Sequence, residues 1–342
     1  MLAVQVAVMK GRGGVLTAAR HYARMFDAVG TPSLCLYRGP AGDILRQDGV
    51  RVVDAPASMT SPFHFLFERG LRRRILDASA GAPPDIIVVH SDKALDAARA
   101  AFPEAGIVAV CHSDKFKRKS SADLVITLNE AQHRSAQERL HGPHVACLGN
   151  PYLAQPAPPA KPPGGLRFNF VGRFIATKDP LALVHAAARL GKPAPALRFI
   201  GDGELAAQIK EAAEAAGMAI ETPGWLWKPF ADFHDHDVLV SPSHWEGLPY
   251  LLQEALDFCV PIIASDIPGN RKALGDGRFG LLAPLGDPGG LAGAMGQATR
   301  DLGALQAMAQ LGRAAVVENY GARPFWGALT GALDEAKKSQ RR

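Results

Sequence analysis

The stretch DIIVVH, residues 85–90, decides the fold class of this chain. Residues 86–89 are all apolar, and the run is too short for an ordinary helix. A strand that is apolar on both faces is typical of a parallel sheet with helices on both sides. Longer amphipathic stretches, such as residues 15–28, alternate with similar runs through the first half of the chain. This alternation predicts an α/β domain with a doubly wound parallel sheet.

A proline-rich stretch, NPYLAQPAPPAKPPGG (150–165), interrupts the pattern near the middle of the chain. Its prolines disfavour both a helix and a central strand, so we expect a linker. The alternation restarts at Leu166 and ends in a set of helices. The expected architecture is two doubly wound, Rossmann-like domains facing a central cleft, with ligands at the carboxyl ends of the strands. The predicted parts are an N-terminal domain (1–150), a linker (151–165), a C-terminal domain (166–322) and a last helix (323–342) that can pack back on the first domain.

The formal net charge of the 342 residues is +5, and the whole excess lies in residues 1–150. The dense basic patches are FERGLRRR (67–74) and HSDKFKRKSSAD (112–123). These patches are either solvated faces or a surface that attracts an anionic membrane or an acidic acceptor. We do not expect nucleic acid as a partner, because no helix-turn-helix, RNA-binding aromatic pattern or zinc finger accompanies the charge.

Several features of the sequence indicate the cellular compartment of the protein. It shows no signal peptide and no apolar run of the length that a membrane span needs. The four cysteines lie far apart, with no C-x-x-C spacing, which argues against a disulfide framework or a zinc knuckle. We therefore expect a cytoplasmic protein, with peripheral binding at the inner face of the plasma membrane as an option.

The stretch HWEGLPYLLQE (244–254) places two acids on a strand-to-helix connection. Glu246 follows the predicted strand DVLVSPS (237–243), and Glu254 lies about two turns into the next helix. The first free amides of that helix, near Leu248, suit a phosphate or sugar hydroxyls. Carboxylates accept paired hydrogen bonds from the vicinal hydroxyls of ribose and hexoses.

Residues 166–290 resemble the family-4 retaining glycosyltransferases, which have the GT-B fold and use a nucleotide-sugar donor. The acids just described match the E-x7-E region of that family. FVGRFIATKDP (170–180) is similar to its G-R-x-x-x-x-K element, FIGDGEL (199–205) to its G-x-G-x-L turn, and PGWLWKPF (223–230) to its base-binding loop. The chain departs from the family at Lys272, where a glutamate is common, and this departure loosens any assignment of the donor.

The resemblance implies a role for each matching residue. Arg173 and Lys178 face the donor diphosphate, Glu254 holds the ribose hydroxyls, and Glu246 faces the transferred sugar. Trp225 lies where the family holds the base, although a plain core position is the alternative reading for it. The implied catalytic set is His112, Glu246, Arg173 and Lys178. The implied donor-binding set is Gly13, Gly14, Gly172, Arg173, Lys178, Gly201, Gly203, Gly224, Trp225, Glu246, Gly247, Leu248, Pro249 and Glu254.

The first domain is less similar to the family. Its clearest match is VMKGRGGVLTAARHYARMF (8–26), whose glycines Gly13 and Gly14 correspond to the glycine-rich loop after the first strand. His112, at the end of GIVAVCH (106–112), matches the histidine near the donor sugar. His90, at the end of the preceding strand, is the alternative, and a structural role is open for either residue.

HDHD (234–237) has the look of a metal cluster, but its consecutive side chains point in divergent directions, so we expect no metal site there. We expect no cofactor and no metal; the nucleotide sugar is a substrate. The predicted activity is retaining transfer of a sugar, with UDP as the preferred nucleotide, to a glycan or lipid-linked acceptor of the cell envelope. A nonhydrolysing nucleotide-sugar epimerase of the same fold and a non-catalytic nucleotide-sugar binding protein remain the alternatives.

Overall fold

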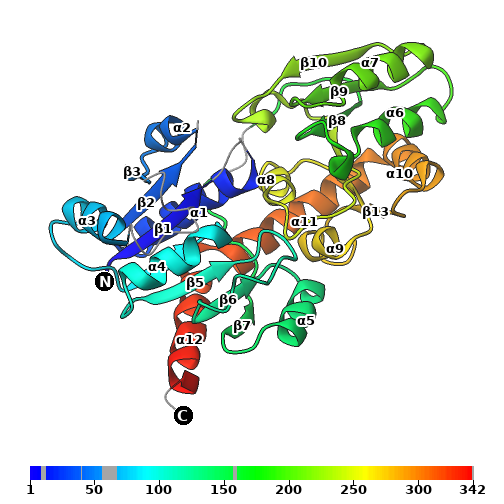
Figure 1. Ribbon diagram of the computed structural model, residues 1–342. Helices are drawn as coiled ribbons and strands as arrows, with labels where there is room; N and C mark the ends of the chain where they lie inside the picture. Colours follow the sequence, from blue (N-terminus) through cyan, green and yellow to red (C-terminus); the bar gives the residue numbers. More distant parts are fainter. Residues whose placement is uncertain (9–12, 40, 56–67, 157–159, 341–342) are drawn as a thin grey trace. The chain divides into compact units, whose positions relative to one another are not determined.

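The computed structural model describes residues 1–8, 13–39, 41–55, 68–156 and 160–340 (Figure 1). The chain forms two compact units. The first consists of Met1–Leu153 and Glu318–Arg342, and the second of Ala154–Val317. Part of the stretch that we expected to be a linker therefore belongs to the second unit, where the Gly164 amide donates to Asp235 and Lys161 Nζ to the Cys259 carbonyl.

The first unit is built on a seven-stranded sheet in the order β3-β2-β1-β4-β5-β6-β7, and all of its strand pairs are parallel. The order reverses between β1 and β4, which is the topological switch point of a doubly wound sheet. The elements of this unit are β1 (Ala3–Val8), α1 (Gly14–Ala28), β2 (Ser33–Arg38), α2 (Gly42–Gln47), β3 (Val52–Asp54), α3 (Glu68–Ala78), β4 (Ile86–Val89), η3 (Asp92–Ala94), α4 (Leu95–Ala101), β5 (Gly106–Val110), β6 (Leu124–Thr127), α5 (Glu130–Arg139), β7 (His144–Cys147) and α12 (Ala322–Gln340).

The second unit repeats this topology in a six-stranded parallel sheet, with the order β10-β9-β8-β11-β12-β13. Its switch point lies between β8 and β11. The elements are β8 (Arg167–Val171), η4 (Ala176–Lys178), α6 (Pro180–Ala188), β9 (Ala196–Ile200), α7 (Ala206–Ala215), β10 (Ile220–Gly224), η5 (Pro229–Asp232), β11 (Asp237–Ser241), α8 (Tyr250–Asp257), β12 (Ile262–Ser265), α9 (Pro268–Ala273), β13 (Leu281–Ala283), α10 (Pro288–Arg300) and α11 (Leu302–Tyr320), which runs on into the first unit.

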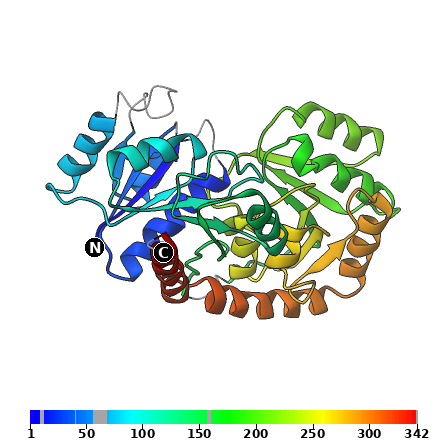
Figure 2. The same ribbon diagram turned by 60° about the horizontal axis from the view of Figure 1, so that its bottom comes forward.

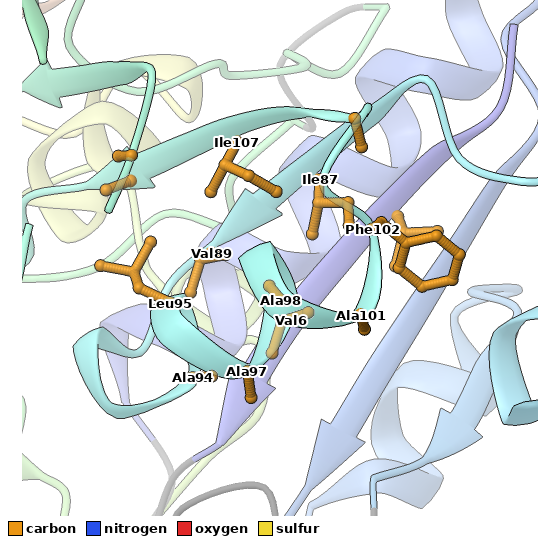
Figure 3. Close-up of a cluster of buried hydrophobic side chains, with 14 of the residues drawn as sticks. Val6, Ile87, Val89, Ala94, Leu95, Ala97, Ala98, Ala101, Phe102 and Ile107 are labelled. Atoms are coloured by element: carbon orange, nitrogen blue, oxygen red, sulfur yellow. The ribbon is translucent and has the colours of Figure 1, made fainter. Parts of the chain in front are cut away.

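Each unit has its own apolar core between sheet and helices. In the first unit, the alanines of α4 pack over Val6, Ile87, Val89 and Ile107 of β1, β4 and β5 (Figure 3). Strands whose residues are buried along their whole length, such as β4 and β5, need helices on both faces. The expected pair of Rossmann-like α/β folds is confirmed, while the cleft between them stays a prediction.

The last helix, α12, packs on α1 within the first unit (Figure 2). Two edge-to-face aromatic contacts join these helices: Tyr22 with Phe325, at 5.6 Å between ring centroids, and Phe26 with Trp326, at 5.7 Å. The Tyr152 amide donates to the Tyr320 carbonyl. The two segments of the first unit that connect to the second unit are therefore hydrogen-bonded to each other.

The elements that the sequence pattern did not lead us to expect include α2, α5, α9, β13 and the 3-10 helix η4. The basic patch FERGLRRR (67–74) lies on α3 from Glu68 onward, and Phe67 lies outside the described residues. Among the described helices, none combines the length and the apolar character that crossing a bilayer requires.

Candidate functional site

Two loops meet at the switch point of the second sheet, where β8 and β11 end. Lys178, in η4 after β8, lies with its Nζ atom 2.5 Å from Oε1 of Glu246, which follows β11. The His244 amide donates to the Thr177 carbonyl at 2.9 Å. His244 Nε2 lies 3.0 Å from Oδ2 of Asp179. The structure thus brings together the cation and the acid that we predicted from separate motifs, 68 residues apart.

The predicted side chains at this end of the sheet differ in burial and in whether they form an ion pair. The side chains of Lys178 and Glu246 are 26% and 11% exposed, so their ion pair is partly withdrawn from water. Arg173, in the same loop as Lys178, is exposed and makes no ion pair with any residue that the structure describes. Because the Arg173 guanidinium is exposed and Lys178 lies beside it, this end of the sheet has positive charge that can bind a phosphate.

The helix α8 begins directly after this loop. Its N-cap is Pro249, which makes no side-chain capping bond, and Leu248 before it is buried. The amino end of α8 therefore lies next to the loop of Glu246, and the helix dipole favours negative charge there. Glu254 lies half-buried on the same helix, between the buried residues Gln253 and Ala255.

Three predicted glycines are required by the protein's own backbone. Gly172, Gly201 and Gly203 have φ values of 148°, 143° and 154°. A Cβ on Gly201 would lie 1.9 Å from the Gly172 carbonyl oxygen, and one on Gly203 would lie 2.5 Å from that of Phe174. The loops after β8 and β9 are thus in close contact, which accounts for Gly201 and Gly203 without a ligand, while the positive φ accounts for Gly172.

The loop after β10 carries the predicted base-binding residues. The Gly224 carbonyl accepts from the Gly201 amide at 2.9 Å, which joins this loop to its neighbour. Trp225 is 37% exposed, and its ring lies 6.0 Å from that of Trp227, tilted by 31°. Trp225 is therefore not a core residue, which removes the alternative reading that the sequence left open.

Sequence reasoning missed the residues that hold the loop of Glu246 in place. A Cβ on Gly269, in α9, would lie 2.4 Å from the Glu246 carbonyl oxygen and 2.5 Å from that of Gly247. Buried Asn270 donates to the Ser265 carbonyl at 2.9 Å, and the Ser265 hydroxyl donates to the Ser243 carbonyl. The Pro-Gly-Asn step after β12 was the available signal for this support.

A pocket also opens in the second unit, beyond the ends of β11, β12 and β13. None of the predicted donor residues lines it, although Asp179 adjoins Lys178 in sequence. Its wall carries a second carboxylate, Asp287, and no lysine or arginine. This composition does not suit a diphosphate, so we place the candidate site at the loops of Lys178 and Glu246. The pocket is lined by Asp179, Ala182, His185, Pro242, Ser265, Ala283, Pro284, Gly286, Asp287, Pro288 and Leu291.

In the first unit, the predicted residues lie at the carboxyl ends of β1, β4 and β5. Gly13 and Gly14 are exposed at the start of α1, and a Cβ on either would have no neighbour within 4 Å among the described residues. The preceding part of the glycine-rich loop, residues 9–12, lies outside the described residues. His112 and His90, the two alternatives, are in contact: Nε2 of His112 lies 3.0 Å from Nδ1 of His90.

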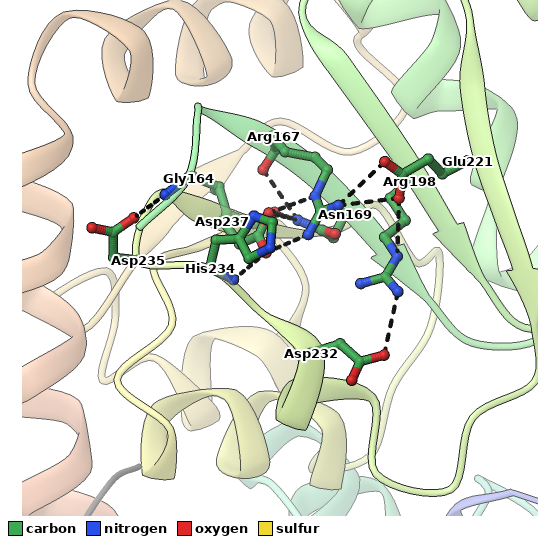
Figure 4. A network of polar contacts seen from close by, with 10 residues as sticks. Gly164, Arg167, Asn169, Arg198, Glu221, Asp232, His234, Asp235 and Asp237 are labelled. Atoms are coloured by element: carbon green, nitrogen blue, oxygen red, sulfur yellow. Dashed lines mark hydrogen bonds and ion pairs between the residues drawn. The ribbon is translucent and has the colours of Figure 1, made fainter. Parts of the chain in front are cut away.

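The HDHD segment lies at the opposite, amino-terminal edge of the second sheet (Figure 4). Asp237 binds Arg167 in a fork, with both N–O distances at 2.8 Å. Burial would raise the pKa of Asp237, but the hydrogen bonds from Arg167 and Asn169 hold that pKa below its usual value. The Gly164 amide donates to Asp235. These contacts give the segment a structural role, and within the described ranges no three His, Cys, Asp or Glu side chains gather as a metal site would require.

Comparison with known proteins finds a family model that covers most of the second unit. The family model of glycosyl transferases group 1 matches residues 154–315. This match supports the resemblance of the second unit to the group 1 glycosyltransferases, while membership of the retaining subclass stays a prediction.

Three curated relatives illustrate the similarity in sequence. A Vi polysaccharide biosynthesis protein, VipC/TviE, of Salmonella typhi is 32% identical over 33% of this chain and 20% of its own length. The lipopolysaccharide core biosynthesis glycosyltransferase LpsE of Rhizobium meliloti is 29% identical over 44% of each chain. A UDP-Gal:alpha-D-GlcNAc-diphosphoundecaprenol alpha-1,3-galactosyltransferase of Escherichia coli is 26% identical over 64% of this chain and 67% of its own. This chain thus spans a fifth of the first relative and less than half of the second.

Solved structures match over almost the whole chain. A glycosyltransferase from Rickettsia africae superposes with a TM-score of 0.76 at 15% identity, covering 98% of both chains. Anabaena HepE, in complex with UDP and glucose, superposes with a TM-score of 0.76 at 15% identity, covering 97% of this chain and 99% of its own. At such identities the likeness establishes the fold, which is that of the GT-B glycosyltransferases.

Proposed function

We propose that this protein is a retaining glycosyltransferase that transfers a sugar from a UDP-linked donor to an acceptor hydroxyl in the synthesis of a cell-envelope polysaccharide, lipopolysaccharide or glycolipid. The observation that carries the proposal is the pairing of Lys178 with Glu246 at a switch point, beside exposed Arg173 and the amino end of α8. A parallel sheet binds its ligands at this place.

The chemistry of sugar transfer accounts for this set of residues. Negative charge builds on the departing diphosphate, and Arg173, Lys178 and the amides of α8 are suited to stabilise it. Glu246 and Glu254 are suited to accept hydrogen bonds from sugar and ribose hydroxyls. We propose that these cationic groups, rather than a metal ion or a cofactor, neutralise the donor diphosphate. The anomeric configuration is retained in this proposal because the leaving phosphate assists attack on the same face.

The donor and acceptor classes are supported by what similar proteins are named for. HepE has been solved with UDP and glucose, and the E. coli relative is named for a UDP-galactose donor and a diphosphoundecaprenol-linked acceptor. LpsE and the structural neighbour WaaB are named for lipopolysaccharide. In the first unit of this chain, Lys115, Lys117 and Arg118 are exposed. We propose that they favour a lipid-linked acceptor at an anionic membrane surface.

The test is a turnover assay with a panel of nucleotide sugars, with undecaprenyl-linked and lipopolysaccharide-type acceptors offered to the full chain. We expect release of UDP and an acceptor-linked sugar with unchanged anomeric configuration. An epimerised nucleotide sugar formed without an acceptor would identify an epimerase instead. Binding of a nucleotide sugar without any turnover would identify a binding protein.

Matched variants connect this activity to the site. Glu246→Gln should lower turnover by about 100-fold, because it removes a charged acceptor at the transferred sugar. The control is Glu211→Gln, which makes the same change at an exposed position of α7. The placement of the site would be contradicted if both variants lost turnover equally, or if neither variant lost turnover.

A further inference from the structure

The tetrapeptide HSDK occurs twice, as residues 90–93 and 112–115, at the ends of the neighbouring strands β4 and β5. The two copies have different surroundings. His90 is 4% exposed, and its ring makes an edge-to-face contact with that of Tyr22, with 5.0 Å between the ring centroids. His112 is half-buried and is thus the histidine nearer to solvent.

A chain of two hydrogen bonds leads from His112 into the core. Nε2 of His112 lies 3.0 Å from Nδ1 of His90, and Nε2 of His90 lies 3.2 Å from Oε1 of Gln5. Gln5 is fully buried in β1, which pairs with β4 at the switch point of the first sheet. The chain therefore ends on a group that the sheet holds in place.

The Gln5 atom at hydrogen-bond distance from His90 is the amide oxygen, whereas the buried Gln5 Nε2 has no partner among the described residues, and this orientation of the amide sets the direction of both hydrogen bonds. An amide oxygen only accepts, so Nε2 of His90 donates to Gln5. In a neutral imidazole the other nitrogen then accepts, so Nδ1 of His90 receives the proton of His112 Nε2. Both rings thereby adopt the Nε2–H tautomer, which is also the one that a free neutral imidazole side chain prefers. Nδ1 of His112 then carries no proton and can accept a hydrogen bond.

Burial keeps both rings neutral near pH 7. It lowers the pKa of His90 well below the usual value, and the adjacent His112 adds to this effect. Burial also lowers the pKa of His112 to about 4, with a further contribution from the Lys119 ammonium. Because a charged imidazole would donate from both nitrogens, neutrality is required for an acceptor at Nδ1.

Further contacts around the two histidines join the strand ends that carry them. The Ser91 hydroxyl exchanges hydrogen bonds with the backbone of Val8, at 2.9 Å from its amide and 2.8 Å from its carbonyl. Asp92 pairs with Lys119, whose side chain is 1% exposed. The ends of β1, β4 and β5 are thus fastened together around the histidine pair.

We propose that Gln5 and His90 are positioning residues that set the tautomer of His112, so that Nδ1 of His112 accepts a hydrogen bond from a sugar hydroxyl. This rests on the proposed function for its ligand, a hydroxyl of the donor sugar. The tautomer itself does not depend on that function. His112 is accordingly the residue that contacts substrate, and His90 acts through it.

The direct test is nitrogen–proton correlation spectroscopy of the full chain labelled with isotopic histidine, near neutral pH and without ligand. The signals of the two rings are assigned with His112→Asn and His90→Asn. We expect both rings to be neutral with the proton on Nε2. A proton on Nδ1 of His112, or a charged His112, would overturn the proposal.

Variants of His90 separate positioning from folding. His90→Phe keeps the ring volume but removes the acceptor, so His112 should become a mixture of tautomers and kcat should fall about tenfold. His90→Asn can place its amide oxygen near the former Nδ1, so it should restore the Nε2–H tautomer and most of kcat. Equal spectra and equal kcat for His90→Phe and the unchanged protein would refute the role of His90.

Variants of Gln5 test the buried end of the chain. Gln5→Leu removes the acceptor for His90 Nε2, so His112 should become a mixture of tautomers. If Gln5→Leu leaves the tautomer fixed in a folded protein, Gln5 is not its determinant. If the tautomers behave as expected but no nucleotide sugar is turned over, the proposed function fails while the hydrogen-bonded chain stands.

Discussion

Lys178 Nζ and Glu246 Oε1 lie 2.5 Å apart, so the cation suited to a diphosphate is already paired with the acid suited to a sugar. A partly buried pair of this kind is costly to break on one side only. Lys178→Met leaves the half-buried Glu246 carboxylate without its cation and should lower the free energy of unfolding by about 1 kcal/mol. The double variant Lys178→Met/Glu246→Gln should recover part of that loss. A double-mutant cycle of chemical denaturation measures the coupling, and a coupling free energy near zero would show that the pair does not stabilise the loops.

The contact between the loops after β8 and β9 makes a prediction about Gly201. Its φ of 143° and the 1.9 Å approach of a Cβ to the Gly172 carbonyl oxygen leave no room for a side chain. Gly201→Ala should therefore lower the free energy of unfolding by more than about 3 kcal/mol.

The matched control is Gly293→Ala, in the exposed part of α10, where a Cβ meets nothing within 4 Å. That change should stabilise the helix by up to about 1 kcal/mol. Comparable stability of the two variants in chemical denaturation would contradict the tight contact between the loops.

The lowered pKa of His112 predicts how stability depends on pH. Burial lowers its pKa from 6.5 to about 4 in the folded state, so between these values the unfolded chain binds a proton that the folded chain does not. The free energy of unfolding should thus fall as the pH is lowered from about 6.5 toward 4, by ~1.4 kcal/mol per pH unit for one such proton. Buried His90 and His21 act in the same direction.

Denaturation across this pH range measures the effect with His112→Asn and the control His185→Asn, which changes an exposed residue of α6. The slope of the free energy of unfolding against pH should decrease in His112→Asn and stay unchanged in His185→Asn. An unchanged slope for His112→Asn would mean that folding does not lower the pKa of His112.

Trp225 is 37% exposed, so its removal should affect binding more than folding. Trp225→Ala should weaken UDP binding about tenfold if its loop holds the base by stacking, while the midpoint of thermal unfolding changes little. Titration calorimetry with UDP checks the affinity, and scanning calorimetry checks the stability. Unchanged affinity for UDP would exclude Trp225 from the base site.

Much of the fold could be predicted because the buried strands are apolar over their whole length, as β4 and β5 show. The helix α5 was missed because its sequence, EAQHRSAQER, buries only Gln132 and Ala136 and lacks an apolar face. Its signal is local: the Asn129 side chain accepts from the Gln132 amide, and the Gln132 side chain accepts from the Leu128 amide.

The candidate site could be predicted only as a set of separate motifs. The pairing of Lys178 with Glu246 depends on β8 and β11 being neighbours, which is a property of strand order and not of local sequence. For the same reason, His90 and His112 stood as competing candidates although the adjacency of β4 and β5 places them in contact.

The most direct measurement is titration calorimetry of UDP against the unchanged protein, Lys178→Met and Lys210→Met, which removes an exposed lysine of α7. We predict saturable binding of UDP that Lys178→Met weakens about 100-fold, because a charge-assisted contact to the diphosphate is lost, and that Lys210→Met leaves unchanged. Equal affinity of Lys178→Met and the unchanged protein for UDP would contradict the placement of a nucleotide-sugar site at the loops of Lys178 and Glu246.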